Sequence, residues 1–365
     1  MSDGSAIEWT DATVNAINGC SLASPGCTNC YAMRLAGTRM KNHPSRKGLT
    51  IDTKAGPVWN GEVRLVESAL LQPLRWQRSR IIFWNAHGDP FHPNVPDQWV
   101  DRMFGVMSLT HWHEHLVLTK RADRMRAYLT SADVVDRIDR QQTELFANHG
   151  RKSPHAFKMK RPAWNWPLPN LWLGVSVEDQ TRADERIPDL LDTPAAGRFL
   201  SCEPLLGPVN LNSIKMFDRE TESGGWETGW ESCLNGKRFD IWAGDDEDPM
   251  RPGFPKIDGI IVGGESGPGA RPMHPDWART LRDQCAAADV DFHFKQWGNI
   301  APLLSARPVE GEGCGVVAWP DGTIGAGHSD RNGGAGQQMY RAEKKIAGRM
   351  LDGATHDALP WTREA

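Results

Sequence analysis

Short apolar segments recur along the chain, and each is followed by polar residues and then by a longer amphipathic or turn-rich stretch. Continuous apolar runs between turn residues are typical of strands that are buried on both faces, as in parallel sheets. The pattern predicts clear strands at residues 81–84, 115–118, 171–177, 198–200, 260–262 and 292–294, with weaker ones at 13–17 and 62–66.

Between these strands, apolar positions about 3.6 residues apart predict helices at residues 96–109 and 276–288. Strands that alternate with helices indicate an α/β fold in which right-handed crossovers join parallel strands. We therefore expect a (β/α) barrel, closed or open, of about six to eight parallel strands.

Two polar segments interrupt this alternation, at about residues 130–168 and 212–256. We interpret both as insertions packed on the barrel, each of them either a lid or a loop. From about residue 300 we expect a C-terminal extension. With these additions, residues 1–365 are predicted to form a single domain.

Polar side chains follow the predicted strands at the points where they end. The carboxyl ends of parallel strands meet at one edge of a sheet or barrel, and ligands bind there. Any one of these residues is more often a helix cap or a solvated charge, but the whole set predicts a site. Its members are Asn85, Asp89, Lys120, Glu178, Glu203, Glu265 and Lys295.

The segment Gly263 to Gly269 is the most distinctive of these strand ends. Glycines permit positive φ and a close approach of the backbone to a ligand. The segment matches neither the dinucleotide fingerprint nor a phosphate-binding loop. We take Gly263 and Gly264, with Glu265, Glu178, Glu203, Asn85 and Lys120, as candidate cofactor-binding residues.

A second polar segment, His111 to His115, has three histidines at alternate positions. It lacks the HExxH spacing of zinc proteases. Histidines that are exposed, or hydrogen-bonded within the core, are therefore a better interpretation than a metal site.

Composition narrows the class of protein. The chain has 42 Lys plus Arg and 46 Asp plus Glu, a net charge of −4, which excludes a strongly basic nucleic-acid coat but leaves room for a local basic groove. No apolar run reaches the ~18 residues of a membrane span, and the N-terminus does not resemble a signal peptide. We expect a cytoplasmic protein with no membrane partner.

Cysteine placement carries the strongest chemical signal. Seven cysteines are too few for the length to make a secreted disulfide scaffold. Cys20, Cys27 and Cys30 form a C-x6-C-x2-C loop that contains glycine and proline, and a helix is expected from Tyr31 to Met40. The positive end of that helix would favour thiolates. The remaining four cysteines are scattered and are interpreted as ordinary buried residues.

Three interpretations of this loop compete. A [4Fe–4S] cluster held by Cys20, Cys27 and Cys30, with one iron open to a substrate or cofactor, is the first choice. A zinc site with three cysteines and a histidine, either His43 or a distant one, comes second. Three ordinary buried thiols come last, because the tight clustering would then be accidental.

Eight stretches in order, which span Trp9 to Gly353, resemble the phage three-cysteine-motif protein family, which is similar to the radical S-adenosylmethionine superfamily. They are SPGCTNCYA, FWNAHGDPFHPNVP, VLTKRADRM, LGVSVEDQ, SCEPLLGP, VGGESGPGARPMHPDW, FKQWG and KKIAGRMLDG. The resemblance implies a radical-SAM-like (β/α) barrel with a cluster on Cys20, Cys27 and Cys30 at its mouth. The chain departs from the superfamily in its longer first cysteine spacing and in its late Gly-Gly-Glu segment.

The resemblance implies an enzyme that uses a [4Fe–4S] cluster and S-adenosylmethionine, with an electron donor as partner. It further implies a nucleic acid or nucleotide-derived substrate, in a phage or prophage context. The alternative is a non-catalytic module, stabilised by zinc or a cluster, that binds nucleic acid or a protein partner.

Overall fold

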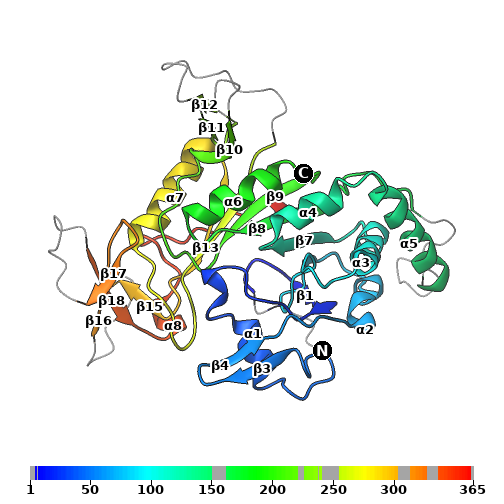
Figure 1. Ribbon diagram of the computed structural model, residues 1–365, viewed down its shortest axis with the longest axis horizontal. Coiled ribbons are helices and arrows are strands. Elements are labelled where there is room, and N and C mark those ends of the chain that lie inside the picture. The colour runs from blue at the N-terminus through cyan, green and yellow to red at the C-terminus, as the bar shows by residue number, and fades with distance from the viewer. Residues whose placement is uncertain are drawn as a thin grey trace. The chain divides into compact units, whose positions relative to one another are not determined.

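The structure contains a seven-stranded sheet (Figure 1). The structure is a computed structural model that describes residues 5, 7–149, 162–220, 226–236, 238–240, 255–302, 313–326 and 336–362. The strand order is β1-β6-β7-β8-β9-β13-β14. The strands are β1 (Ala12–Val14), β6 (Ile81–Trp84), β7 (Glu114–Thr119), β8 (Leu171–Ser176), β9 (Gly197–Cys202), β13 (Gly259–Gly263) and β14 (Asp291–Gln296).

The six clear predicted strands are confirmed to within two residues, and the registered pairs of this sheet are parallel. The weaker predictions are confirmed only in part. Residues 13–17 are divided between β1 and β2 (Ile17–Asn18), and residues 62–66 contain β5 (Arg64–Leu65), which pairs with β2 antiparallel outside this sheet. Their apolar runs are buried on both faces, as in β13, where every residue is buried. The predicted helices are also present, as α1 (Tyr31–Gly37), α3 (Asp97–Leu109) and α7 (Pro275–Ala288). The α/β class is therefore confirmed.

The closed form of the predicted barrel is wrong, because the strand order is open, with β1 at one edge of the sheet and β14 at the other. The C-terminal segment occupies the outer edge of β14. The backbone N–H of Phe294 donates to the carbonyl of His356 at 2.9 Å, and His293 forms a bridge with Asp357. These bonds use the donors and acceptors that another strand would need to close the barrel.

The chain divides into two compact units. Unit 1 comprises Met1–Val175 and Asp192–Arg198, and unit 2 comprises Ser176–Leu191 and Phe199–Ala365. In unit 1, β2 (Ile17–Asn18) pairs with β5 (Arg64–Leu65), and β3 (Thr50–Thr53) forms a hairpin with β4 (Gly56–Trp59). Its short helices are η1 (Pro25–Cys27), α2 (Glu67–Leu70), η2 (Pro73–Arg75) and α4 (Ala122–Leu129).

The segment predicted as a first insertion contains α5 (Val134–His149), which packs against α3. Residues 150–161 of that segment lie outside the described residues. The second predicted insertion contains a three-stranded antiparallel sheet in unit 2, made of β10 (Ile214–Glu220), β11 (Trp226–Glu231) and β12 (Arg238–Asp240). Residues 221–225, 237 and 241–254 are likewise outside the described part.

The predicted C-terminal extension contains a small antiparallel sheet in unit 2. Its strands are β15 (Ile300–Pro302), β16 (Gly313–Ala318), β17 (Ile324–Ala326) and β18 (Gln337–Arg341). The other helices of unit 2 are α6 (Gln180–Leu191), α8 (Lys344–Ala347) and η4 (Pro360–Thr362). Within the described ranges, no helix combines the length and the apolar character that crossing a membrane requires.

Candidate functional site

The backbone that leads into the cysteine loop depends on two glycines. Gly19 has φ +95°, and a Cβ there would lie 2.1 Å from the carbonyl oxygen of Glu62. Its N–H donates to the carbonyl of His87 at 3.2 Å, and it forms a parallel bridge with Gly88. Because side chains would separate these segments, the glycines let the cysteine loop lie against the polar segment that follows β6.

Two tight turns then shape the backbone of the cysteine loop. The N–H of Cys27 donates to the carbonyl of Ser24 at 2.9 Å, and that of Cys30 donates to the carbonyl of Cys27 at 3.3 Å. Cys30 is the residue that precedes α1. Its sulfur therefore lies at the positive end of that helix, but burial outweighs the thiolate preference expected there, because the pKa of the Cys30 thiol is raised.

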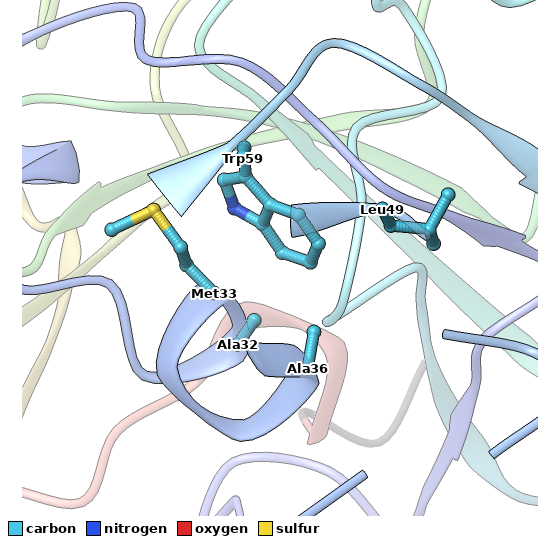
Figure 2. Packing of buried hydrophobic residues seen from close by; sticks show 5 residues of the cluster. All are labelled: Ala32, Met33, Ala36, Leu49 and Trp59. Carbon is cyan, nitrogen blue, oxygen red and sulfur yellow. The ribbon is translucent and has the colours of Figure 1, made fainter. Parts of the chain in front are cut away.

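An apolar cluster packs α1 against Trp59 of β4 and Leu49. Figure 2 shows Ala32, Met33 and Ala36 of α1 facing Trp59 of β4 and Leu49. Cys20 and Cys30 are partly buried and pack against this cluster. Cys20 and Cys30, the first and third cysteines of the motif, are thus held by the core of unit 1.

The three thiols are free, and their surroundings differ. Cys27 is buried, and its Sγ accepts the N–H of Ala23 at 3.4 Å. Burial raises the pKa of the Cys20 thiol to about 12, with Asp89 adding to the effect. Burial also raises the pKa of the Cys30 thiol, while the backbone N–H groups of Met33 and Ala32 act in the opposite direction. A metal that binds here must therefore displace thiol protons.

A largely buried arginine faces the first cysteine. Arg121 Nη1 lies 3.6 Å from Cys20 Sγ and 2.8 Å from Asp89 Oδ2. Its Nη2 donates to the carbonyl and to the hydroxyl of Ser21, at 3.0 and 2.9 Å. The same hydroxyl is 2.9 Å from His92 Nε2. The segments after β6 and β7 therefore hold the cysteine loop through one guanidinium group.

The donor chemistry of the loop fits an iron–sulfur cluster. Thiolates are the usual ligands of such clusters, and the three thiols of the loop take part in no disulfide. Among the described residues, no group of three or more His, Cys, Asp or Glu side chains is arranged as a ready site for a metal ion. Ligation by Cys20, Cys27 and Cys30 therefore stays a proposal that rests on the chemistry of the loop.

Two candidate cofactor residues of unit 1 have structural partners. Asn85 is buried at φ +59°, and its Oδ1 accepts the N–H of Ile17 at 2.8 Å. The backbone N–H of Lys120 donates to Asp89 Oδ2 at 3.2 Å. Both residues lie at strand ends and help to hold the polar network beside the cysteine loop, while their role toward a cofactor stays a prediction.

In unit 2, the ends of β9, β13 and β14 bring together another part of the predicted set. Lys295 Nζ lies 2.8 Å from Glu203 Oε1. A Cβ on Gly263 would lie 2.7 Å from the same oxygen, and one on Gly264 would lie 2.0 Å from the carbonyl oxygen of Trp297. Gly264 is therefore required for packing against the backbone of Trp297, whatever ligand it meets, whereas a side chain at Gly263 would displace only the Glu203 carboxylate.

The other two acidic candidates of unit 2 are paired with arginines. Glu265 forms a two-point ion pair with Arg271, with distances of 2.9 and 2.6 Å. Glu178 is fully buried, and its Oε2 lies 2.9 Å from Arg186 Nη1. Any ligand amine that binds Glu265 must therefore compete with Arg271. The expectation that the whole strand-end set meets in one cavity stays a prediction.

The sequence predicts that the scattered cysteines are ordinary buried residues, and that the histidines of the segment His111 to His115 are exposed or hydrogen-bonded in the core. Both predictions are confirmed where the structure describes these residues. Cys202, Cys233 and Cys285 are buried and free, and the side chain of Cys314 lies outside the described part. His111 is exposed, whereas His113 and His115 are buried and hydrogen-bonded. His111 is thus a surface residue, and His113 and His115 are core residues.

Sequence reasoning missed three residues that support the cysteine loop, namely Ser21, His92 and Trp59. Ser21 and His92 contact each other although they are 71 positions apart. The position of His92, three residues after Asp89 in a strand-end segment, was the signal that could have singled it out. A hydrogen bond from the Trp59 side chain lowers the pKa of Cys30, although burial has the larger and opposite effect. Nothing near Trp59 in the sequence marks this role.

Comparison with known proteins adds a family assignment. No curated protein matches the chain, and no solved structure matches it. The resemblance to the phage three-cysteine-motif family therefore stays a prediction. A family described as "Protein of unknown function (DUF5131)" matches residues 4–360, nearly the full length. On that match, the chain belongs to the DUF5131 family.

Proposed function

We propose that this chain binds a [4Fe–4S] cluster through Cys20, Cys27 and Cys30 and acts with S-adenosylmethionine on a nucleic acid or nucleotide-derived substrate. The observation that carries the proposal is a single loop with three free thiols, held between the start of α1 and the Arg121 guanidinium. When bound, such a cluster supplies electrons for the reductive cleavage of S-adenosylmethionine. Three protein thiolates leave one iron open for that cofactor.

The residues of the chain have separate tasks in this proposal. The apolar cluster around Met33 and Trp59 shields Cys30 from water on the α1 side. Arg121 holds the backbone after Cys20 through the two bonds to Ser21. We assign S-adenosylmethionine contacts to the strand-end candidates of the sequence analysis, and an electron donor is the implied partner.

Metal analysis tests the proposal directly. Protein purified without oxygen is expected to contain about four irons and four sulfides per chain. Substitution of any one loop cysteine (C20A, C27A or C30A) should remove most of the iron. C285A is the matched control, because it also removes a buried free thiol but leaves the loop intact. Zinc without sulfide would support the non-catalytic module instead.

Activity is a separate measurement. With dithionite as electron source, the loaded protein is expected to release 5′-deoxyadenosine from S-adenosylmethionine, and the three cysteine variants are not. A loaded cluster with no release under several reductants would refute the enzyme part of the proposal and leave a binding or electron-transfer protein.

A further inference from the structure

The Arg121 side chain has an unusual position for a residue that only holds a loop. It is 11 % exposed, and its partner Asp89 is 8 % exposed. One nitrogen of the guanidinium, Nη2, makes both bonds to Ser21, and the other, Nη1, lies between Asp89 Oδ2 and Cys20 Sγ. The loop is thus held by one nitrogen, while the other places positive charge beside a cysteine sulfur.

The Asp89 carboxylate accepts four hydrogen bonds. Its Oδ1 accepts the hydroxyl of Thr119 at 2.8 Å and the N–H of Phe91 at 2.9 Å. Its Oδ2 accepts the N–H of Lys120 at 3.2 Å in addition to the bond from Arg121. With so many bonds, the carboxylate has no freedom to turn away, so it holds Arg121 in place against Cys20.

From this geometry we infer that Arg121 is a positioning residue that also sets the reduction potential of the cluster, and that Asp89 opposes its charge. The inference rests on the proposed function. One-electron reduction adds a negative charge to the cluster and changes no bond or proton in the protein. A nearby guanidinium therefore stabilises the reduced form, and a nearby carboxylate destabilises it, most strongly where water is excluded.

Two substitutions with opposite expected effects test the inference. Arg121→Met removes the positive charge at similar volume, and we expect the reduced-to-oxidised ratio at a fixed potential to fall about tenfold. This corresponds to a midpoint that is lower by about 59 mV for a one-electron couple. Asp89→Asn removes the opposing negative charge but keeps an amide oxygen that can accept the bond from Arg121, so the midpoint should rise. The measurement is a dithionite titration followed by visible absorption.

Arg137→Met is the matched control. Arg137 is also a partly buried arginine of unit 1, and its Nε lies 3.1 Å from the buried Asp101 Oδ1, but its partners do not include the cysteine loop. We expect its midpoint to equal that of the wild type. A shift of the same size in Arg137→Met would show that loss of any buried arginine perturbs the cluster, and it would overturn the inference.

The outcomes separate the inference from the proposed function. Wild-type protein without iron and sulfide would overturn both. A wild-type cluster whose midpoint is unchanged in Arg121→Met, or shifts in the same direction in both variants, would overturn the inference alone. If Arg121→Met fails to fold, as judged by circular dichroism, the sign of the shift in Asp89→Asn decides the matter.

Discussion

His115 shows how a polar residue becomes part of the core of this protein. It is fully buried in β7, where Trp84 Nε1 donates to its Nδ1 at 3.0 Å and its Nε2 lies 3.1 Å from the Thr110 hydroxyl. Both ring nitrogens can keep these partners only while the ring is neutral, because a proton on Nδ1 would prevent it from accepting the Trp84 N–H. Burial, with a smaller contribution from His113, lowers the pKa of His115 to about 3.

This burial predicts acid sensitivity. The unfolded chain takes up a proton at His115 below about pH 6.5, whereas the folded protein does not until about pH 3, so stability falls as the pH drops through this window. At pH 5 the expected loss is about 2 kcal/mol. In His115→Gln, urea unfolding at pH 7 and pH 5 should show a pH-dependent loss that is smaller by this amount.

The exposed His111 provides the control for that experiment. His111→Gln should keep the wild-type difference in unfolding free energy between the two pH values. An equal acid loss in wild type and His115→Gln would show that other buried groups carry the effect.

At the scale of elements, the contact of α1 with the β3–β4 hairpin supports the cysteine loop. Gly37 ends α1 directly against β4, and a Cβ there would lie 2.0 Å from Pro57 Cβ. The helix can approach the hairpin this closely only because position 37 has no side chain. The same approach brings Met33 and Ala36 onto Trp59 (Figure 2).

Gly37→Ala is therefore expected to destabilise the protein although alanine favours helices. The gain in helix propensity is about 1 kcal/mol, and the overpacking cost is roughly 1 to 3 kcal/mol. Urea unfolding should show a net loss of about 1 kcal/mol, and the iron content after cluster loading should fall because α1 moves away from the hairpin.

Gly207→Ala is the comparison for this prediction, since a Cβ at that position would meet Asp179 Cβ at an ordinary contact distance of 3.4 Å. Its unfolding free energy and iron content should match those of the wild type. Greater stability of Gly37→Ala would mean that Pro57 yields and that the close approach is not required.

At the scale of the whole molecule, the candidate ligands of the cluster all belong to unit 1. A ligand that binds only the folded state stabilises the parts whose opening would release it. Removal of iron should therefore weaken unit 1 selectively, first in the segment that contains the loop, α1 and the hairpin.

Hydrogen exchange with mass spectrometry measures this effect. After iron is removed with a chelator, amides in residues 16–66 should exchange at least about tenfold faster, whereas those of α7 and β14 in unit 2 should change little. Equal acceleration in both units would show that the molecule opens as one cooperative block. No change in residues 16–66 would contradict cluster binding by the loop.

Much of this architecture could be predicted from local pattern. The run Ile81 to Trp84 forms β6 at its predicted bounds, and the periodic segment after Pro96 forms α3. The hairpin of β3 and β4 was missed because its residues, nearly all of them exposed or half-buried, carry no apolar alternation. Its importance comes from Trp59 and Pro57, whose partners lie in α1.

The sequence by itself determined the clear strands of the seven-stranded sheet, helices α1, α3 and α7, the α/β class and the cysteine loop, because apolar runs, periodicity and cysteine spacing are properties of neighbouring residues. Only the tertiary structure decided that the barrel stays open and which charge faces the loop. Arg121 and Cys20 are 101 positions apart, and His356 reaches β14 from beyond a separate small sheet. Such contacts depend on how distant segments pack, which no local pattern encodes.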